Sequence, residues 1–256
     1  MTASDSHQAT ARSGIDRRGI RDLLLVGLTI SVGAVDALSF LGLGKVFSAF
    51  VTGDIAFLGF RAGGAPGPSV PRTLAATAAF ALGAFLAARI VRRTRNSDSV
   101  WPRPAMVSLA VSLVFQAAFL ALWASLKGHA GSGSGDVLIA LSGVAMGMQF
   151  ATCFSLGVRA DFTTAATATL AVLAGDLAGW SQTRGERRRL AATVVGLFVG
   201  AVVGAVLLIN ARTWAPVFPL VMTGVVLITA AVVFEAGIDS VQPSSSAPPR
   251  AFTTTT

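Results

Sequence analysis

Eight apolar runs of about 15 to 24 residues, separated by short polar stretches, dominate the sequence. They are Leu23–Gly44, Val46–Phe60, Leu74–Val91, Ala105–Leu126, Val137–Val158, Phe162–Leu177, Leu190–Ile209 and Val217–Glu235. A helix that crosses the ~30 Å hydrocarbon core of a bilayer needs ~20 such residues. Only 12% of the residues are charged, against ~25% in soluble domains. We therefore predict an all-α integral membrane protein.

Two of the runs are too short to cross a bilayer as straight helices. Val46–Phe60 and Phe162–Leu177 have about 15 and 16 residues, which reach ~22–24 Å at ~1.5 Å per residue. Both are rich in Gly or Thr. We predict that these two runs are re-entrant or broken segments, and that the other six runs span the membrane.

The positions of the basic residues favour this topology, because Lys and Arg are enriched in cytoplasmic loops. With six spans and a cytoplasmic N-terminus, 15 of the 20 Lys and Arg residues fall on the cytoplasmic side. With eight spans the division is 12 inside and 8 outside, which is a weak bias. Both termini are therefore predicted to be cytoplasmic.

The chain also divides into two similar halves. Residues 20–127 and 137–236 each read as a long helix, a short polar-dotted segment, a small-residue helix and a long helix, and a Gly/Ser linker at 128–136 joins them. Shifts of 113 to 117 residues align Asp36 with Gln149, Phe47 with Phe162, Thr52 with Thr167 and Gly83 with Gly200. Three spans per half is an odd number, so the second half is predicted to be inverted. An inverted 3+3 repeat with interrupted helices at the midplane is typical of transporters.

Outside these halves lie a basic tail, residues 1–19, and a Pro/Ser/Thr-rich tail, residues 237–256, which is predicted to be disordered. The net charge of +8 comes mostly from arginines between the apolar runs, so we expect contact with anionic lipid headgroups and no nucleic-acid binding. Cys153 is the sole cysteine, and neither histidine has the spacing of a metal ligand. No catalytic constellation is present, so neither a metal, a cofactor nor an enzymatic activity is predicted.

Asp36 lies inside the first apolar run, and a carboxylate near a bilayer centre costs ~2.5–3.5 kcal/mol on insertion scales. One interpretation is a binding or coupling residue for a proton or cation. The other is a structural residue whose hydrogen bonds hold a broken helix. The sequence leaves both open.

Thr52, Gly53 and Asp54 form a second candidate group in the first short segment. A glycine permits a break whose free backbone groups could face a substrate. The alternative is an ordinary helix start, since Asp is a good N-cap residue.

In the second half the corresponding candidates are Gln149 in the fifth run and Thr163 and Thr167 in the second short segment. A mid-helix glutamine can contact a substrate or join two helices. Threonine hydroxyls often bond back to carbonyls of their own helix. Lone Gln116 is predicted to join helices.

Small residues at four-residue spacing indicate close helix packing. Two rows have this spacing, Gly83 with Ala87, and Gly196 with Gly200 and Gly204. We predict that they pack helices together, and the pattern is also compatible with oligomerisation.

The run from Gly33 to Asp54, G-A-V-D-A-L-S-F-L-G-L-G-K-V-F-S-A-F-V-T-G-D, followed by A-M-G-M-Q and a Thr-rich segment, resembles the YoaK family of bacterial membrane proteins. The resemblance covers residues 20 to 235. It implies a multi-helix protein of the bacterial inner membrane and no particular substrate. The family typically has Asn after T-G, where this chain has Asp54.

Three functions fit these observations. The first is a small-molecule transporter or permease with its site between the two short segments, formed by Asp36, Thr52, Gly53, Asp54, Gln149, Thr163 and Thr167. The second is a non-transporting scaffold or assembly subunit, in which the polar residues pair with one another. The third is an aquaporin-like channel, which also uses six helices and two half-helices. A polar cavity bounded by both short segments would favour the first.

Overall fold

The structure is a computed structural model that describes residues 3–92, 100–156, 169–171, 174–175 and 184–235. The regular secondary structure within these ranges is helical, with no strand. The elements are α1 (Ala3–Gly42), α2 (Val51–Ala62), α3 (Val70–Val91), α4 (Arg103–Ser125), α5 (Ser132–Ser155), α7 (Arg184–Asn210), the short 3₁₀ helix η2 (Arg212–Trp214) and α8 (Val217–Glu235).

Six helical stretches of the described chain are long and apolar enough to cross a membrane. They lie in α1, α3, α4, α5, α7 and in η2 with α8, and they coincide with the six predicted spans. The prediction of an all-α membrane protein is confirmed. Large apolar side chains such as Phe198, Ile209 and Ile228 are exposed on the outside of the bundle, where lipid chains would cover them.

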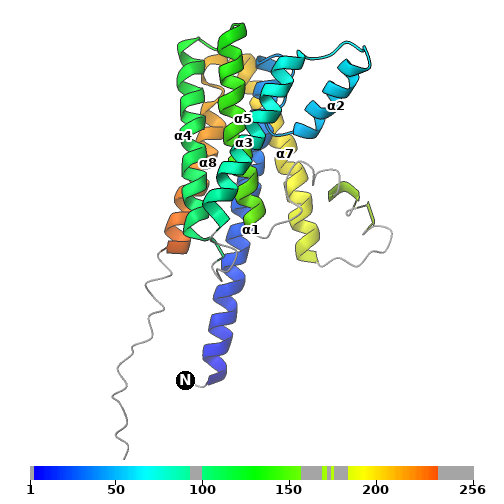
Figure 1. Cartoon of the computed structure of the whole chain (residues 1–256). Coiled ribbons are helices and arrows are strands. Elements are labelled where there is room, and N and C mark those ends of the chain that lie inside the picture. The colour runs from blue at the N-terminus through cyan, green and yellow to red at the C-terminus, as the bar shows by residue number, and fades with distance from the viewer. Residues whose placement is uncertain (1–2, 93–99, 157–168, 172–173, 176–183, 236–256) are drawn as a thin grey trace, which may run out of the picture.

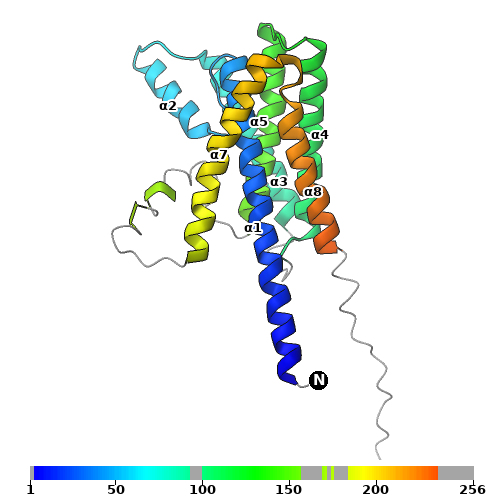
Figure 2. The same cartoon turned by 180° about the vertical axis from the view of Figure 1, so that it is seen from behind.

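The six long helices form one bundle, with α2 standing at its side (Figures 1 and 2). The first residues of α1 and the last residues of α8 lie at the same end of the bundle. The turns that follow α1, α4 and α7 lie at the opposite end. An even number of crossings produces this arrangement.

Helices α1 and α5 form the centre of the bundle. In each of them 67% of the most apolar stretch is buried, against 28–39% in the other four spans. Their buried residues include many small ones, such as Ser31, Ala34, Ser142 and Ala145. Small side chains let neighbouring helices approach closely on several sides.

Two helix pairs, α1 with α7 and α3 with α5, run parallel and touch backbone to backbone. A Cβ added to Gly200 would overlap the carbonyl oxygen of Ile30 in α1. A Cβ added to Gly83 would overlap the carbonyl oxygen of Val144 in α5. Only glycine fits at these crossings, because any side chain would push the helices apart.

Helix α1 ends in a tight turn whose backbone bonds run from Leu43 N to Ser39 O at 2.9 Å and from Lys45 N to Phe40 O at 3.0 Å. Gly44 has φ +99° and Lys45 has φ +62°, both in the left-handed region. A Cβ on Gly44 would also lie 2.7 Å from Nη1 of Arg72. Glycine is therefore favoured there by its conformation, and its lack of a side chain leaves room for the Arg72 guanidinium.

Several boundaries differ from the sequence prediction. The first short helix begins at Val51 rather than Val46, because the amides of residues 47–49 bond to side chains instead of continuing a helix. Helix α1 extends back to Ala3, through most of the predicted N-terminal tail, and α5 begins at Ser132, inside the predicted linker. Most of the predicted segment Phe162–Leu177 lies outside the described residues.

Candidate functional site

Two aspartates hold the stretch that connects α1 to α2. Oδ1 of Asp36 accepts hydrogen bonds from the backbone amides of Ser48 (3.0 Å) and Ala49 (2.8 Å). Oδ1 of Asp54 accepts one from the amide of Phe47 (3.0 Å). Three consecutive amides are therefore bound by two carboxyl groups. Since Asp36 lies six residues before the end of α1, this stretch has turned back along α1 by ~9 Å.

The second oxygen of Asp54 has an unusual environment. Asp54 is fully buried, and no hydrogen-bond partner for Oδ2 occurs among the described residues. A buried polar atom without a partner is costly, so such atoms are rare in folded proteins. Asp54 does not line the cavity beside Asp36 that is described in the next paragraph. The hydrogen bond of its side chain in the described part of the chain is the one from the amide of Phe47.

A cavity of about 530 Å³ lies beside Asp36. Its walls come from α1, from the stretch that leads into α2, from α7 and from Leu170. Asp36 is the only ionisable side chain among the described residues that line it, and 8% of Asp36 is exposed. The remaining lining is apolar: Gly33, Ala37, Phe40, Leu41, Phe47, Phe50, Leu170, Leu197, Ala201 and Ala205.

Three phenylalanine rings form one side of this cavity. Phe40 and Phe47 stack with their centroids 4.8 Å apart, and Phe50 meets Phe47 edge-on at 5.2 Å. Gly53 lies under these rings, because a Cβ there would come within 2.7 Å of the Phe50 ring. Thr52 is exposed and does not line the cavity.

Gln149 lies apart from this group. It is fully buried, and its Nε2 donates to the carbonyl oxygen of Leu28 at 3.2 Å, which joins α5 to α1. Leu28 is eight residues, or ~12 Å along the helix, from Asp36. Oε1 of Gln149 has no partner among the described residues. Thr163 and Thr167 lie outside the described residues. Leu170, which belongs to the same predicted short segment, lines the cavity.

The predicted packing residues lie at the two close helix crossings. A Cβ added to Gly196 would lie 3.3 Å from Cγ1 of Val26 in α1, and one added to Gly204 would lie 2.7 Å from Cα of Ala34. Gly200 and Gly83 make the contacts described above. Ala87 is fully buried and packs in one apolar cluster with residues of α5.

Hydrogen bonds between small polar side chains form a second feature, which the sequence analysis largely missed. Thr223 of α8 bonds to Ser31 of α1 at 3.2 Å and to Gln116 of α4 at 3.3 Å. The prediction that Gln116 joins helices is thus confirmed. Ser142 of α5 donates to Ser48 at 2.7 Å, beside the amides held by Asp36. Serines at mid-span were the available signal, but their partners lie in distant parts of the chain.

Arg72, also missed, fastens the turn after α1. Its guanidinium donates to Oδ1 of Asp136 (2.9 Å), to Leu43 O (3.2 Å) and to Ser132 O (3.1 Å). It thereby links α3, α5 and the end of α1. A lone arginine at the start of a predicted span, with an aspartate at the start of another, was the available signal.

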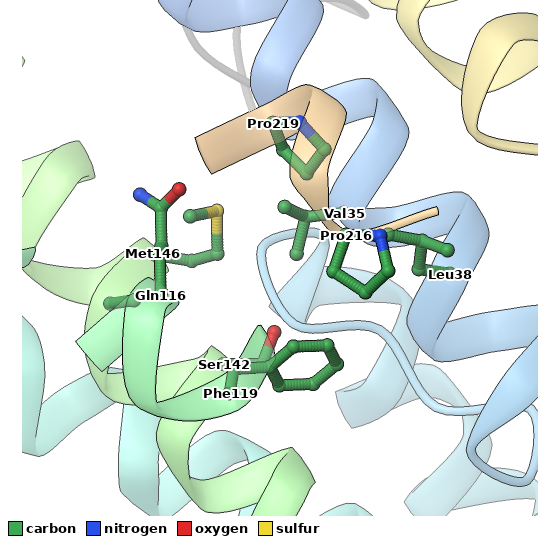
Figure 3. A pocket seen from close by; sticks show the side chains of 9 residues that line it. Val35, Leu38, Gln116, Phe119, Ser142, Met146, Pro216 and Pro219 are labelled. Atoms are coloured by element: carbon green, nitrogen blue, oxygen red, sulfur yellow. The ribbon is translucent and has the colours of Figure 1, made fainter. Parts of the chain in front are cut away.

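Figure 3 shows a much smaller cavity between α1, α4, α5 and α8. Its volume is about 20 Å³, and Gln116 and Ser142 are its polar lining among apolar side chains such as Val35, Phe119 and Met146. That volume holds about one water molecule. It excludes an organic solute from this position.

A third cavity, of about 730 Å³, lies between α3 and α5. Its lining includes Arg89 and Arg92 beside Phe85, Phe150 and Phe154. The Arg89 guanidinium lies 5.9 Å from the centroid of the Phe85 ring. This cavity therefore combines aromatic rings with positive charge.

Among the described residues no three His, Cys, Asp or Glu side chains gather as metal ligands do. Cys153 is buried. The chemistry that the site offers is therefore a fixed carboxylate beside an apolar, aromatic space.

Comparison with known proteins agrees with this membrane architecture. A family described as "Protein of unknown function (DUF1275)" matches residues 24–229, which is most of the chain. The chain belongs to the DUF1275 family. It is 32% identical over 159 residues to the UPF0700 transmembrane protein YoaK of Bacillus subtilis (strain 168), a match that covers 62% of this chain and 68% of that protein. The predicted likeness to the YoaK family is confirmed, and this DUF1275 protein is an integral membrane protein. No solved structure matches it significantly.

Proposed function

We propose that the protein is a small-molecule transporter or permease of the bacterial cytoplasmic membrane. One observation carries the proposal. A buried carboxylate, Asp36, is fixed by two backbone amides at the wall of a 530 Å³ cavity between α1, α7 and the stretch that leads into α2. Small-molecule sites are usually concave, mostly apolar spaces of ~300–1,000 Å³ with a few placed polar groups.

An inverted repeat, which this function would use for alternating access, is supported by the helix crossings. The Gly33–Leu197 contact and the Gly147–Phe80 contact are alike, and so are Gly200–Ile30 and Gly83–Val144. Gly147 and Val144 of α5 lie 114 positions after Gly33 and Ile30 of α1. Leu197 and Gly200 of α7 lie 117 positions after Phe80 and Gly83 of α3. The pair α1–α7 thus corresponds to the pair α3–α5.

The same two offsets relate the two large cavities. Asp36, Ala37, Phe40 and Leu41 line the first cavity, and the residues 114 positions later, Phe150, Ala151, Phe154 and Ser155, line the other. Ala201 and Ala205 likewise correspond to Ala84 and Ala88, 117 positions earlier. The equal burial of α1 and α5 agrees with the same relation. By these offsets the counterpart of Asp36 is Phe150, and the sequence alignment with Gln149 was shifted by one residue.

A re-entrant first segment is part of the same proposal. Helix α2 has 12 residues, ~18 Å in length, which is too short to span a bilayer. The stretch before it turns back along α1 as far as Asp36. We place this segment on the external side and both termini in the cytoplasm, following the distribution of basic residues.

One Arg–Asp ion pair, and a second Arg and Asp that could pair at the opposite end of the bundle, fit an alternating mechanism. Arg72 and Asp136 join α3 to α5 at 2.9 Å. The same offsets point to Arg189 in α7 and Asp22 in α1, where Asp22 is bound by the neighbouring Arg21 at 2.8 Å. In the proposed cycle the first pair closes the external side, and the second pair closes the cytoplasmic side.

Reconstituted vesicles test the function. The purified full chain in proteoliposomes is expected to accelerate uptake of at least one solute from a broad panel, and Asp36→Asn is expected to abolish that uptake. Glu235→Gln removes a carboxyl group at the last residue of α8, a helix that does not line the cavity, so it serves as a charge control. Uptake that equals empty vesicles across the panel would count against transport.

One observation favours the second candidate, a non-transporting scaffold. The hydrogen bonds of Asp36 hold the stretch before α2, which is a structural task in its own right. In a scaffold, Asp36→Asn would change thermal stability and partner binding together and would leave solute flux at background. The vesicle assay and a thermal unfolding measurement on the same variant separate the two.

A further inference from the structure

We infer that the Asp36 cavity binds an organic monocation, such as a quaternary ammonium or phosphonium ion with apolar substituents. The inference names the ligand class of the proposed transport site and so rests on that proposal. Four features of the lining carry it.

The first feature is the charge of the cavity. Asp36 is the one ionisable group among the described lining residues, and it is mostly buried. Two amide hydrogen bonds at 3.0 and 2.8 Å both end on its Oδ1. Such bonds stabilise a carboxylate and fix its direction. A ligand with a single positive charge would complement the one negative charge in the described lining.

The second feature is the group of rings formed by Phe40, Phe47 and Phe50. The face of an aromatic ring attracts a cation within ~6 Å of its centroid, and this attraction increases when the cation is desolvated. Phe47 is stacked between Phe40 and Phe57, with centroids 4.8 and 6.2 Å away, so the faces left for a cation belong to Phe40 and Phe50. Phe40 lies on α1, one helical turn after Asp36, so ring and carboxylate lie on the same face of that helix.

The third feature is the absence of other polar side chains among the described lining residues. A sugar or another polyol would leave its hydroxyl groups without partners, and each unsatisfied group weakens binding. An anion would meet Asp36 with no basic side chain in the described lining to bind it. A zwitterion would face the same cost for its negative end.

The fourth feature argues against a bare divalent metal ion. Calcium takes six to eight oxygen ligands, and magnesium needs near-octahedral oxygen coordination. Here one carboxylate, with one oxygen already bonded to two amides, faces hydrocarbon. An organic cation needs no such coordination, because its substituents fill the apolar walls.

A pair of probes with the same shape and opposite charge tests the inference. The full chain in maltoside micelles is dialysed against radiolabelled tetraphenylphosphonium or tetraphenylborate, with protein-free micelles subtracted. We expect saturable binding of about one tetraphenylphosphonium per chain and no saturable binding of tetraphenylborate. Equal saturable binding of both ions would overturn the inference, and this comparison needs no variant.

Variants then locate the binding. Asp36→Asn, whose Oδ1 can still accept the two amide bonds, is expected to weaken tetraphenylphosphonium binding at least tenfold. Ala205→Phe, which fills the cavity and leaves the carboxylate in place, is expected to weaken binding as well. Glu235→Gln, at the last residue of α8 and outside the cavity lining, should stay within twofold of the parent. Unchanged binding in both cavity variants would overturn the assignment to this cavity.

Two further arms separate the sources and the claims. Dialysis with short-chain phosphatidylcholine as a competitor shows whether a lipid headgroup occupies the site. Loss of tetraphenylphosphonium binding at saturating lipid would identify a lipid as the ligand and would overturn the inference of a free solute. If the phosphonium binds and no vesicle flux is found, the ligand class stands and transport fails. If vesicles transport solutes of other classes and the phosphonium does not bind, the ligand class fails and transport stands.

Discussion

Replacing Gly200 by alanine tests the close crossing on which the bundle depends. The added Cβ would lie 2.8 Å from the carbonyl carbon of Ile30 and closer still to its oxygen. Ordinary van der Waals contact begins near 3.4 Å. Both atoms on the other side belong to backbone, so no side chain can rotate away, and α1 and α7 must separate locally.

Two opposing effects set the magnitude. Overpacking of a tight contact costs ~1–3 kcal/mol. Alanine in a helix interior is favoured over glycine by up to ~1 kcal/mol. The second effect can be removed by a matched glycine, because Gly224 in α8 has no atom within 4 Å of an added Cβ. The difference in unfolding free energy between Gly200→Ala and Gly224→Ala therefore isolates the packing cost, and we expect ~1–3 kcal/mol.

The assay is reversible unfolding of the purified chain in mixed micelles, followed by helix content and by tryptophan fluorescence. A difference of 1.4 kcal/mol is tenfold in the unfolding equilibrium constant, which this assay resolves. Gly83→Ala, at the corresponding crossing of α3 with α5, should cost about as much as Gly200→Ala. If Gly200→Ala and Gly224→Ala unfolded with equal free energies, the backbone contact between α1 and α7 would be refuted.

Three further predictions concern the site and the topology. Asp36→Asn should insert normally and lose activity or its pH dependence, whereas Asp54→Asn should be milder; uptake measured against pH checks this, and full activity with an unchanged profile would exclude a coupling role for Asp36. Arg72→Gln should lower the unfolding free energy more than Asp136→Asn. An exposed ion pair is worth ~0–1 kcal/mol, and Arg72 also donates hydrogen bonds to two carbonyl oxygens. The reverse order in the unfolding assay would contradict this. Reporter fusions after residue 96 should behave as cytoplasmic and fusions after residue 131 as external, and an external signal at 96 would contradict the six-span topology.

The spans could be predicted from the sequence because length and hydrophobicity decide whether a helix crosses a bilayer. The predicted run Leu190–Ile209 lies within α7, and Val217–Glu235 coincides with α8. The predicted helix boundary was wrong where side-chain carboxyl groups, in place of backbone carbonyl groups, accept the hydrogen bonds of the amides. Val46–Phe50 is apolar and reads as helix, but Asp36 and Asp54 take its amides from positions 12 and 7 residues away, respectively.

Composition of the site was harder to predict than its position. Asp36 stood out because a carboxylate in an apolar run is costly. The rings of Phe40, Phe47 and Phe50 did not stand out, since phenylalanine in such a chain usually faces lipid or core. Their role depends on how the stretch after α1 turns back, which is set by hydrogen bonds between residues distant in sequence. The contact of Gln149 with Leu28, in another helix, could not be read from either residue alone.

The relation between the two large cavities bears on how such a fold could work in one direction. The scaffold around them is alike, with glycine crossings at matching positions and alanines at matching positions of α3 and α7. Their chemistry is opposite, because the first contains Asp36 and the second contains Phe150 at the corresponding position, with Arg89 and Arg92 nearby. A solute that is attracted to the first wall is therefore repelled at the second. In the proposed inverted repeat, two halves that exchange conformations, with a binding group in only one of them, would provide a single site and two ways to reach it, which is the minimum that alternating access requires.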